Sequence, residues 1–193
     1  MSGSHDRIKL EINYLHRLPI INLNTRVFKR FGLDIKFLQL GLEELIATKI
    51  IALLSRYTPR DLYDIYQVSK SNLNLNDNQL SQLVLYYGLI ARENISDLYQ
   101  LKIDNITGRE INRHLFPMLT NSENPVLDEM RDSVVEFLKP IIQLKKSQLD
   151  AIEAFYSTGE LHPDSLFEHA DIYSRVLESP GFRWKIANIM SNK

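Results

Sequence analysis

The sequence contains no cysteine and few glycines, and both shortages exclude whole classes of site. Without cysteine there is no disulfide, zinc ribbon, iron–sulfur cluster or thiol nucleophile, and a reducing, cytoplasmic location is favoured. The seven glycines never stand closer than nine residues apart, so no segment supplies the clustered glycines of Walker-type or dinucleotide-binding loops. No apolar run approaches the roughly 18 residues of a membrane span. What remains, 193 residues with 44% hydrophobic side chains, is enough to bury a core.

Positive charge is concentrated in the front third of the chain. Residues 1–70 carry 11 lysines and arginines against 7 acidic residues, whereas residues 71–193 carry 12 against 17. A basic segment ahead of an acidic one suits a polyanionic ligand, such as a nucleotide or RNA, at the front. An ordinary solvated surface is the competing interpretation.

The hydrophobic pattern changes its period near Gly41. Before it, residues 8–14 alternate apolar and polar side chains, and 26–31 and 35–40 flank Gly32, which predicts about three short strands. After it, helical spacing predicts helices over 42–57 and 60–70. Further helices are expected over 79–90, 95–102, 108–116, 126–145, 147–157, 164–178 and 182–190. The predicted fold is therefore α+β and predominantly α-helical, with a small β patch in a first domain (1–70) and a helical second domain (71–193).

Two cations share one face of the helix expected after Gly41. Lys49 lies in an otherwise apolar stretch, and Arg56 follows it two turns later on the same side. Together they could grip phosphate groups, the lysine as a point charge and the arginine as a planar fork. The alternative is that Lys49 buries only its aliphatic stem and keeps its ammonium in water.

A second polar group follows at the start of the next helix, in the run Arg60-Asp61-Leu-Tyr-Asp64. Asp61 and Asp64 stand at positions i and i+3, which lets both carboxylates face one site. Acidic residues also favour the positive end of a helix dipole, so capping by Asp61 and an Arg60–Asp64 pair are equally open. Spacing does not choose between these alternatives.

These runs resemble a known family. Glu43-Glu44-Leu-Ile-Ala-Thr-Lys49, then Arg56 and Arg60-Asp61-Leu-Tyr-Asp64, preceded by Lys9-Leu-Glu11-Ile, are similar to the AbiEii-like nucleotidyltransferase toxins of type IV toxin–antitoxin, abortive-infection systems. Ser179-Pro-Gly-Phe-Arg-Trp-Lys185 is similar to a segment that closes many members, and Trp184 is expected to dock the last helix. The resemblance covers roughly residues 7–70 and 179–186, the C-terminal two thirds of such a toxin.

The resemblance implies a DNA polymerase β-like enzyme that transfers a nucleotidyl group from an NTP to an acceptor such as tRNA or a protein. Lys49 and Asp61 match the catalytic positions, Lys49, Arg56 and Arg60 would bind the nucleotide, and Asp64 would support them. Glu11 matches the third acid that holds Mg²⁺. In such a site, metal and cations neutralise the charge that builds on the phosphate oxygens. An antitoxin protein is the implied partner.

One part of the family pattern is missing from this sequence. The family's glycine turn and paired metal-binding acids should precede Glu11, and no Asp-x-Asp occurs in the chain. We therefore expect a truncated nucleotidyltransferase core that is weakly active or inactive as an isolated chain. Two alternatives are a non-catalytic helical module that binds a partner protein such as an antitoxin, and a nucleic-acid-binding helical domain, against which the acidic back half argues.

Overall fold

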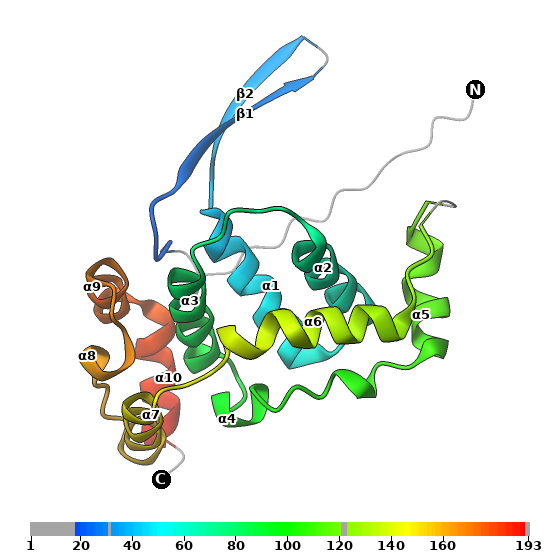
Figure 1. The fold of residues 1–193 in the computed structure, drawn as a ribbon. Coiled ribbons are helices and arrows are strands. Elements are labelled where there is room, and N and C mark those ends of the chain that lie inside the picture. Colours follow the sequence, from blue (N-terminus) through cyan, green and yellow to red (C-terminus); the bar gives the residue numbers. More distant parts are fainter. Residues whose placement is uncertain (1–17, 31, 121–122, 192–193) are drawn as a thin grey trace.

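The computed structural model describes residues 18–30, 32–120 and 123–191, and it combines a projecting β-hairpin with a helical body (Figure 1). The fold is α+β and mostly helical, as predicted. The hairpin consists of β1 (Asn24–Arg30) and β2 (Leu33–Gln39). The helices are α1 (Leu42–Arg56), α2 (Pro59–Lys70), α3 (Asp77–Ile90), α4 (Ile95–Leu98), α5 (Gly108–His114), α6 (Leu127–Ile141), α7 (Lys146–Thr158), α8 (Pro163–Leu166), α9 (Ala170–Glu178) and α10 (Pro180–Ser191). Short 3₁₀ turns lie at Ile103–Asn105 and Phe116–Met118.

The hairpin pairs its strands in antiparallel register, from Asn24 opposite Gln39 to Arg30 opposite Leu33. Gly32 takes a φ of +75° in the connecting turn, a conformation that glycine adopts without strain. The two strands predicted around this glycine are confirmed, with boundaries about two residues earlier than expected. The third predicted strand, residues 8–14 with Glu11, lies outside the described residues.

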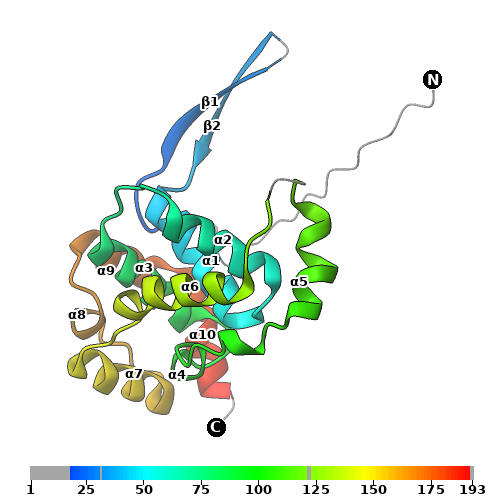
Figure 2. The same ribbon diagram turned by 45° about the vertical axis from the view of Figure 1, so that its right-hand side comes forward.

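The body is organised around α3, which packs against α1, α6, α9 and α10. From Gln82 to Ile90 every residue of α3 is buried, which explains why its sequence is apolar on all sides rather than on one stripe. α1 also packs against α2, and α2 against α6, so one continuous core joins these helices (Figure 2). The domain boundary expected at residue 70 stays a prediction. None of the described helices is long and apolar enough to cross a membrane.

Three expected helices differ from the structure. The helix expected over 95–102 ends at Leu98. The helix expected over 126–145 ends at Ile141, one residue after Pro140, which has no N–H to donate to the carbonyl of Glu136 and so weakens the last turn. The helix expected over 164–178 is divided into α8 and α9. Between them, the Oε1 atom of Gln82 accepts hydrogen bonds from the backbone N–H groups of Glu168 and His169, at 2.9 and 3.0 Å. A buried side chain of α3 thus satisfies donors that a continuous helix would have used internally.

The last helix is docked by residues other than the expected tryptophan. Trp184 is 40% exposed, whereas Phe182 is 1% exposed and packs against the rings of Tyr86 and Phe155. The ammonium of Lys185 donates to the carbonyls of residues 91–93, at the C-terminal end of α3. Burial lowers the pKa of Lys185, but these carbonyls and the helix dipole favour its charged form.

Candidate functional site

The candidate site forms at the corner where α1 ends and α2 begins. α1 stops at Tyr57, whose φ of 49° and ψ of 47° place it in the left-handed region and turn the chain sharply. Thr58 then caps α2, and Pro59 occupies its first turn, where a missing N–H costs nothing. The short connection folds α2 back along α1, so residues of both helices face one opening.

A cavity of about 690 Å³ opens at this corner. Its volume lies within the range of pockets that bind small molecules. It is lined by Lys49 and Arg56 of α1, Tyr57 and Thr58 of the turn, Pro59, Arg60, Asp61 and Asp64 of α2, and Glu110 and His114 of α5. The structure therefore brings together five of the six residues predicted for the site. Glu11, the sixth, lies outside the described residues.

Four charged side chains of this pocket are paired with one another. The Nζ atom of Lys49 lies 2.5 Å from Oδ2 of Asp64, and both side chains are nearly half exposed. Nη2 of Arg56 lies 2.7 Å from Oδ1 of Asp61, whose side chain is 11% exposed. The resulting charge is balanced, with three cations against three carboxylates among the lining residues.

These contacts bear on the alternatives that the sequence left open. Asp61 accepts a hydrogen bond from the Thr58 hydroxyl at 2.7 Å, and its own N–H donates to that hydroxyl at 3.3 Å. Capping is therefore one role of Asp61. The Arg60–Asp64 pair does not form, because Asp64 pairs with Lys49 and Nε of Arg60 donates to the carbonyl of His114 at 3.3 Å. Lys49 does not merely extend into water, since it reaches across to α2.

The sequence did not predict that two side chains of α5, Glu110 and His114, line the pocket. Glu110 and His114 stand at positions i and i+4 of that helix and so lie on one face. Hydrogen bonds from the backbone and side chain of Thr107 lower the pKa of Glu110, with a smaller contribution from His114. The i, i+4 spacing is visible in the sequence, but no local pattern links α5 to the corner some 50 residues earlier.

The described residues do not fit the Mg²⁺ ion that nucleotidyl transfer generally uses. Both carboxylate oxygens of Asp61 accept hydrogen bonds, Oδ2 of Asp64 is paired with Lys49, and Oε2 of Glu110 accepts from Thr107. Across the described part of the chain, no group of three or more histidine and carboxylate side chains is placed to hold a metal ion. We therefore derive no chemical step through a metal from these residues.

The chain is mostly helical α+β, and its corner pocket is lined by lysine and arginine side chains, residue types that can bind phosphate groups, together with three carboxylates. The chain belongs to the AbiEii family: the model of the nucleotidyl transferase AbiEii toxin, type IV TA system, matches residues 1–154. The match includes the whole corner from Lys49 to Asp64 and continues through the helical middle, whereas the Ser179–Lys185 segment lies beyond it. No curated protein and no solved structure matches the chain.

Proposed function

We propose that the corner pocket binds the phosphate groups of a nucleoside triphosphate, as the first step of nucleotidyl transfer. The single observation that carries this proposal is the convergence of Lys49, Arg56 and Arg60 on one cavity in a chain of a nucleotidyl transferase family. The guanidinium groups offer paired donors to phosphate oxygens, and Lys49 offers a compact charge. All three would neutralise charge on the transferred group.

A phosphate group in this pocket competes with the ion pairs already present. The ammonium of Lys49 donates to Asp64, but an ammonium has three N–H donors, so a phosphate group can share the lysine with that carboxylate. Arg60 is held less strongly, because its side chain donates a long hydrogen bond of 3.3 Å to the carbonyl of His114 and forms no ion pair among the described residues. We infer that Asp61 orients Arg56 in the ligand-free pocket and, through its hydrogen bond with Thr58, keeps the turn in place when Arg56 contacts a phosphate group.

Titration of the chain with GTP, ATP, CTP and UTP in the presence of Mg²⁺ tests this proposal. We expect at least one NTP to bind, and Lys49→Ala to weaken that binding by about tenfold or more, the equivalent of about 1.4 kcal/mol. Lys145→Ala is the matched control, because Lys145 also forms an exposed ion pair, with Glu168, but lies outside the pocket. No binding of any NTP by the wild-type chain would refute the proposal.

We also propose that the isolated chain transfers no nucleotidyl group efficiently to tRNA or protein. Phosphoryl transfer assisted by metal needs at least two well-placed carboxylates. The sequence has no Asp-x-Asp, and Asp61 and Asp64 are engaged by Arg56 and Lys49. Incubation with labelled NTP, tRNA and cell protein should yield no labelled product above background. Robust labelling that Lys49→Ala abolishes would contradict this.

A second candidate function, binding of a partner protein such as an antitoxin, is favoured by the exposed apolar side chains of the β1–β2 hairpin. Soluble chains seldom expose a contiguous group of large apolar residues unless it binds something. Co-elution with the product of a neighbouring gene, with no effect of NTP on thermal stability, would support this function over nucleotide binding.

A further inference from the structure

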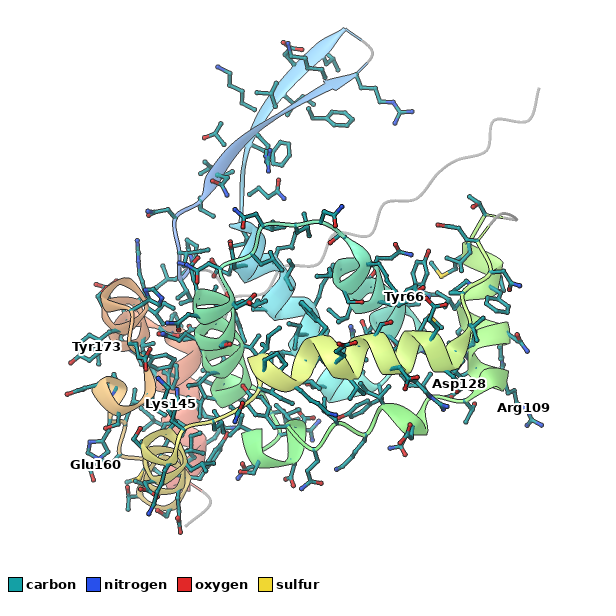
Figure 3. The ribbon with its side chains drawn as sticks, viewed as in Figure 1. Tyr66, Arg109, Asp128, Lys145, Glu160 and Tyr173 are labelled. Atoms are coloured by element: carbon teal, nitrogen blue, oxygen red, sulfur yellow. The ribbon has the colours of Figure 1, made fainter. Side chains whose placement is uncertain are left out.

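The β1–β2 hairpin stands clear of the helical body, with its side chains projecting on both sides (Figure 3). Thirteen of its fourteen strand residues are exposed. They include large apolar side chains, among them Phe28 at 49%, Leu33 at 60% and Leu38 at 66% exposure. A two-stranded hairpin is at best marginally stable in water, so this arrangement points to a bound state in which the hairpin is covered.

The register gives the two faces of the hairpin different chemistry. Residues directly opposite each other in an antiparallel pair lie on the same face. The first face therefore carries four apolar side chains and two arginines, namely Phe28, Leu33, Ile35, Phe37, Arg26 and Arg30. The second face carries Thr25, Val27, Lys29, Asp34, Lys36 and Leu38. The first face is mainly apolar with an arginine toward each end of β1, and the second is mixed, with two lysines and one aspartate, so both faces carry a net positive charge.

Charge distinguishes among the molecules that could cover the hairpin. The strands hold four basic residues and one acidic residue, Asp34, whose carboxylate lies 3.5 Å from Lys29. The whole chain has a net charge of −1, so the hairpin is a basic element on a nearly neutral protein. A second copy of the hairpin would bring like charges together, whereas an acidic segment would complement them.

The backbone supplies a second recognition element. In the described part of the chain the sheet contains only β1 and β2, so each strand has an outer edge with no neighbouring strand. Such an edge is a template for an added strand. A single-stranded nucleic acid could stack on Phe28 and Phe37, but it would leave the aliphatic side chains and both edges uncovered. The edges and the aliphatic residues together favour a protein strand.

We propose that the hairpin docks an extended segment of a partner protein in which apolar residues alternate with aspartate or glutamate. The segment adds as a third strand to one edge. Because side chains alternate along a strand, its apolar residues extend the Phe28 face while its carboxylates lie on the Lys36 face. This inference deepens the second candidate function and does not depend on the nucleotide pocket.

Fluorescence anisotropy of the full chain with three labelled probes tests the proposal. The probes are a peptide of about nine residues that alternates valine with glutamate, the same peptide with lysine in place of glutamate, and a short oligouridylate; strands of this length are common in sheets. We expect the glutamate peptide to bind at least about tenfold more tightly than the other two probes. On its addition, hydrogen exchange should slow at amides of β1 or β2.

Matched variants separate the two recognition elements. Phe28→Ser and Lys36→Glu should each weaken the glutamate peptide by about tenfold or more. Met118→Ser, at an apolar residue that is 59% exposed on a 3₁₀ turn, and Lys146→Glu, on α7, should leave binding unchanged. The core contains no hairpin residue, so circular dichroism and the Tm of the body should be the same in all variants.

Three results would overturn the docking proposal. The first is no binding of the glutamate peptide, or equal binding by Phe28→Ser. The second is tighter, Phe28-dependent binding of oligouridylate, which would make the hairpin a nucleic-acid surface. The third is self-association that Phe28→Ser abolishes, which would make a second copy the occupant. If the chain binds NTP but not the glutamate peptide, only the docking proposal is refuted, and the nucleotide proposal stands. If an antitoxin still co-elutes with the Phe28→Ser variant, the partner protein binds at a surface other than the hairpin.

Discussion

The two ends of helix α1 use charged residues in opposite ways. Near its start, Glu44 is fully buried, and its carboxylate accepts hydrogen bonds from the N–H groups of Ile20 and Ile21 and from the hydroxyl of Tyr87, at 2.8, 3.2 and 2.6 Å. Toward its end, Lys49 and Arg56 reach an open pocket in which each has one carboxylate partner. The first arrangement is saturated, and the second leaves donors that a ligand can use.

The contrast distinguishes a charged residue of α1 that stabilises the fold from charged residues of the same helix that face an open pocket. A buried carboxylate with three donors fastens the segment before the hairpin to α1 and α3, and removing it leaves those donors unpaired. Half-exposed ion pairs contribute little stability, because solvent screens them and the side chains lose entropy in forming them. The Lys49–Asp64 pair is therefore expected to add little to the stability of the fold.

Replacement of Glu44 should have the largest effect on stability. Glu44→Ala removes the carboxylate that accepts from two backbone N–H groups and from the Tyr87 hydroxyl, which should lower the free energy of unfolding by about 3–5 kcal/mol. Glu43→Ala is the control, because the half-buried Glu43 accepts a single 3.3 Å hydrogen bond, from Asn76, and should cost less than about 1 kcal/mol. Urea unfolding measures both. If both variants lost a similar free energy of unfolding, the proposed difference between Glu44 and Glu43 would be wrong.

Alkaline pH should destabilise the fold through its buried tyrosines. Burial raises the pKa of Tyr86 and of Tyr156 to about 12. Above pH 10 the unfolded chain releases protons that the folded chain keeps, so stability falls between about pH 10 and 12, by at most about 1.4 kcal/mol per pH unit for each tyrosine. Urea unfolding at several pH values should show this slope, and Tyr86→Phe should reduce it. Titration of both tyrosines near pH 10 in the folded chain, followed by absorbance, would contradict the prediction.

Replacement of Asp61 should have a smaller, intermediate effect. Asp61→Ala removes the reciprocal contacts with Thr58 and the partner of Arg56, which should cost about 1–2 kcal/mol. Asp61→Asn should restore part of this stability, since its amide oxygen can still accept a hydrogen bond from Thr58. Lys49→Ala, at an exposed pair, should cost no more than about 1 kcal/mol. If Lys49→Ala proved as destabilising as Asp61→Ala, the lysine would be structural, and the pocket would lose its main candidate for phosphate binding.

Local patterns predicted most of the fold. The period-two runs around Gly32 predicted the hairpin, and the spacing of apolar residues predicted α1, α2 and α3 with small errors at their ends. The errors arose where a distant residue decided the backbone. Gln82 satisfies the N–H groups that divide α8 from α9, and Phe182 and Lys185, rather than Trp184, dock α10. Neither contact leaves a trace in the local sequence.

The candidate site was predicted in its local part and missed in its distant part. Lys49, Arg56, Arg60, Asp61 and Asp64 come from two consecutive helices, so their spacing and family resemblance were enough to group them. Glu110 and His114 join them only because α5 folds back against α2. The adjacent acids Glu43 and Glu44 are indistinguishable as sequence, yet only Glu44 is fully buried.

The sequence by itself determined where strands give way to helices, where the chain turns at Thr58-Pro59, and which charged residues lie near that turn. It could do so because hydrophobic periodicity, helix capping and the conformational preferences of glycine act over a few residues. Only the tertiary structure decided which charges are used internally and which face an opening. That outcome depends on desolvation by segments far along the chain: Tyr87 and the residues before β1 enclose Glu44, whereas no segment covers the α1–α2 corner in the described part of the chain. Among the described residues, no other segment covers the hairpin, although its pattern predicts strands and two strands alone are marginally stable.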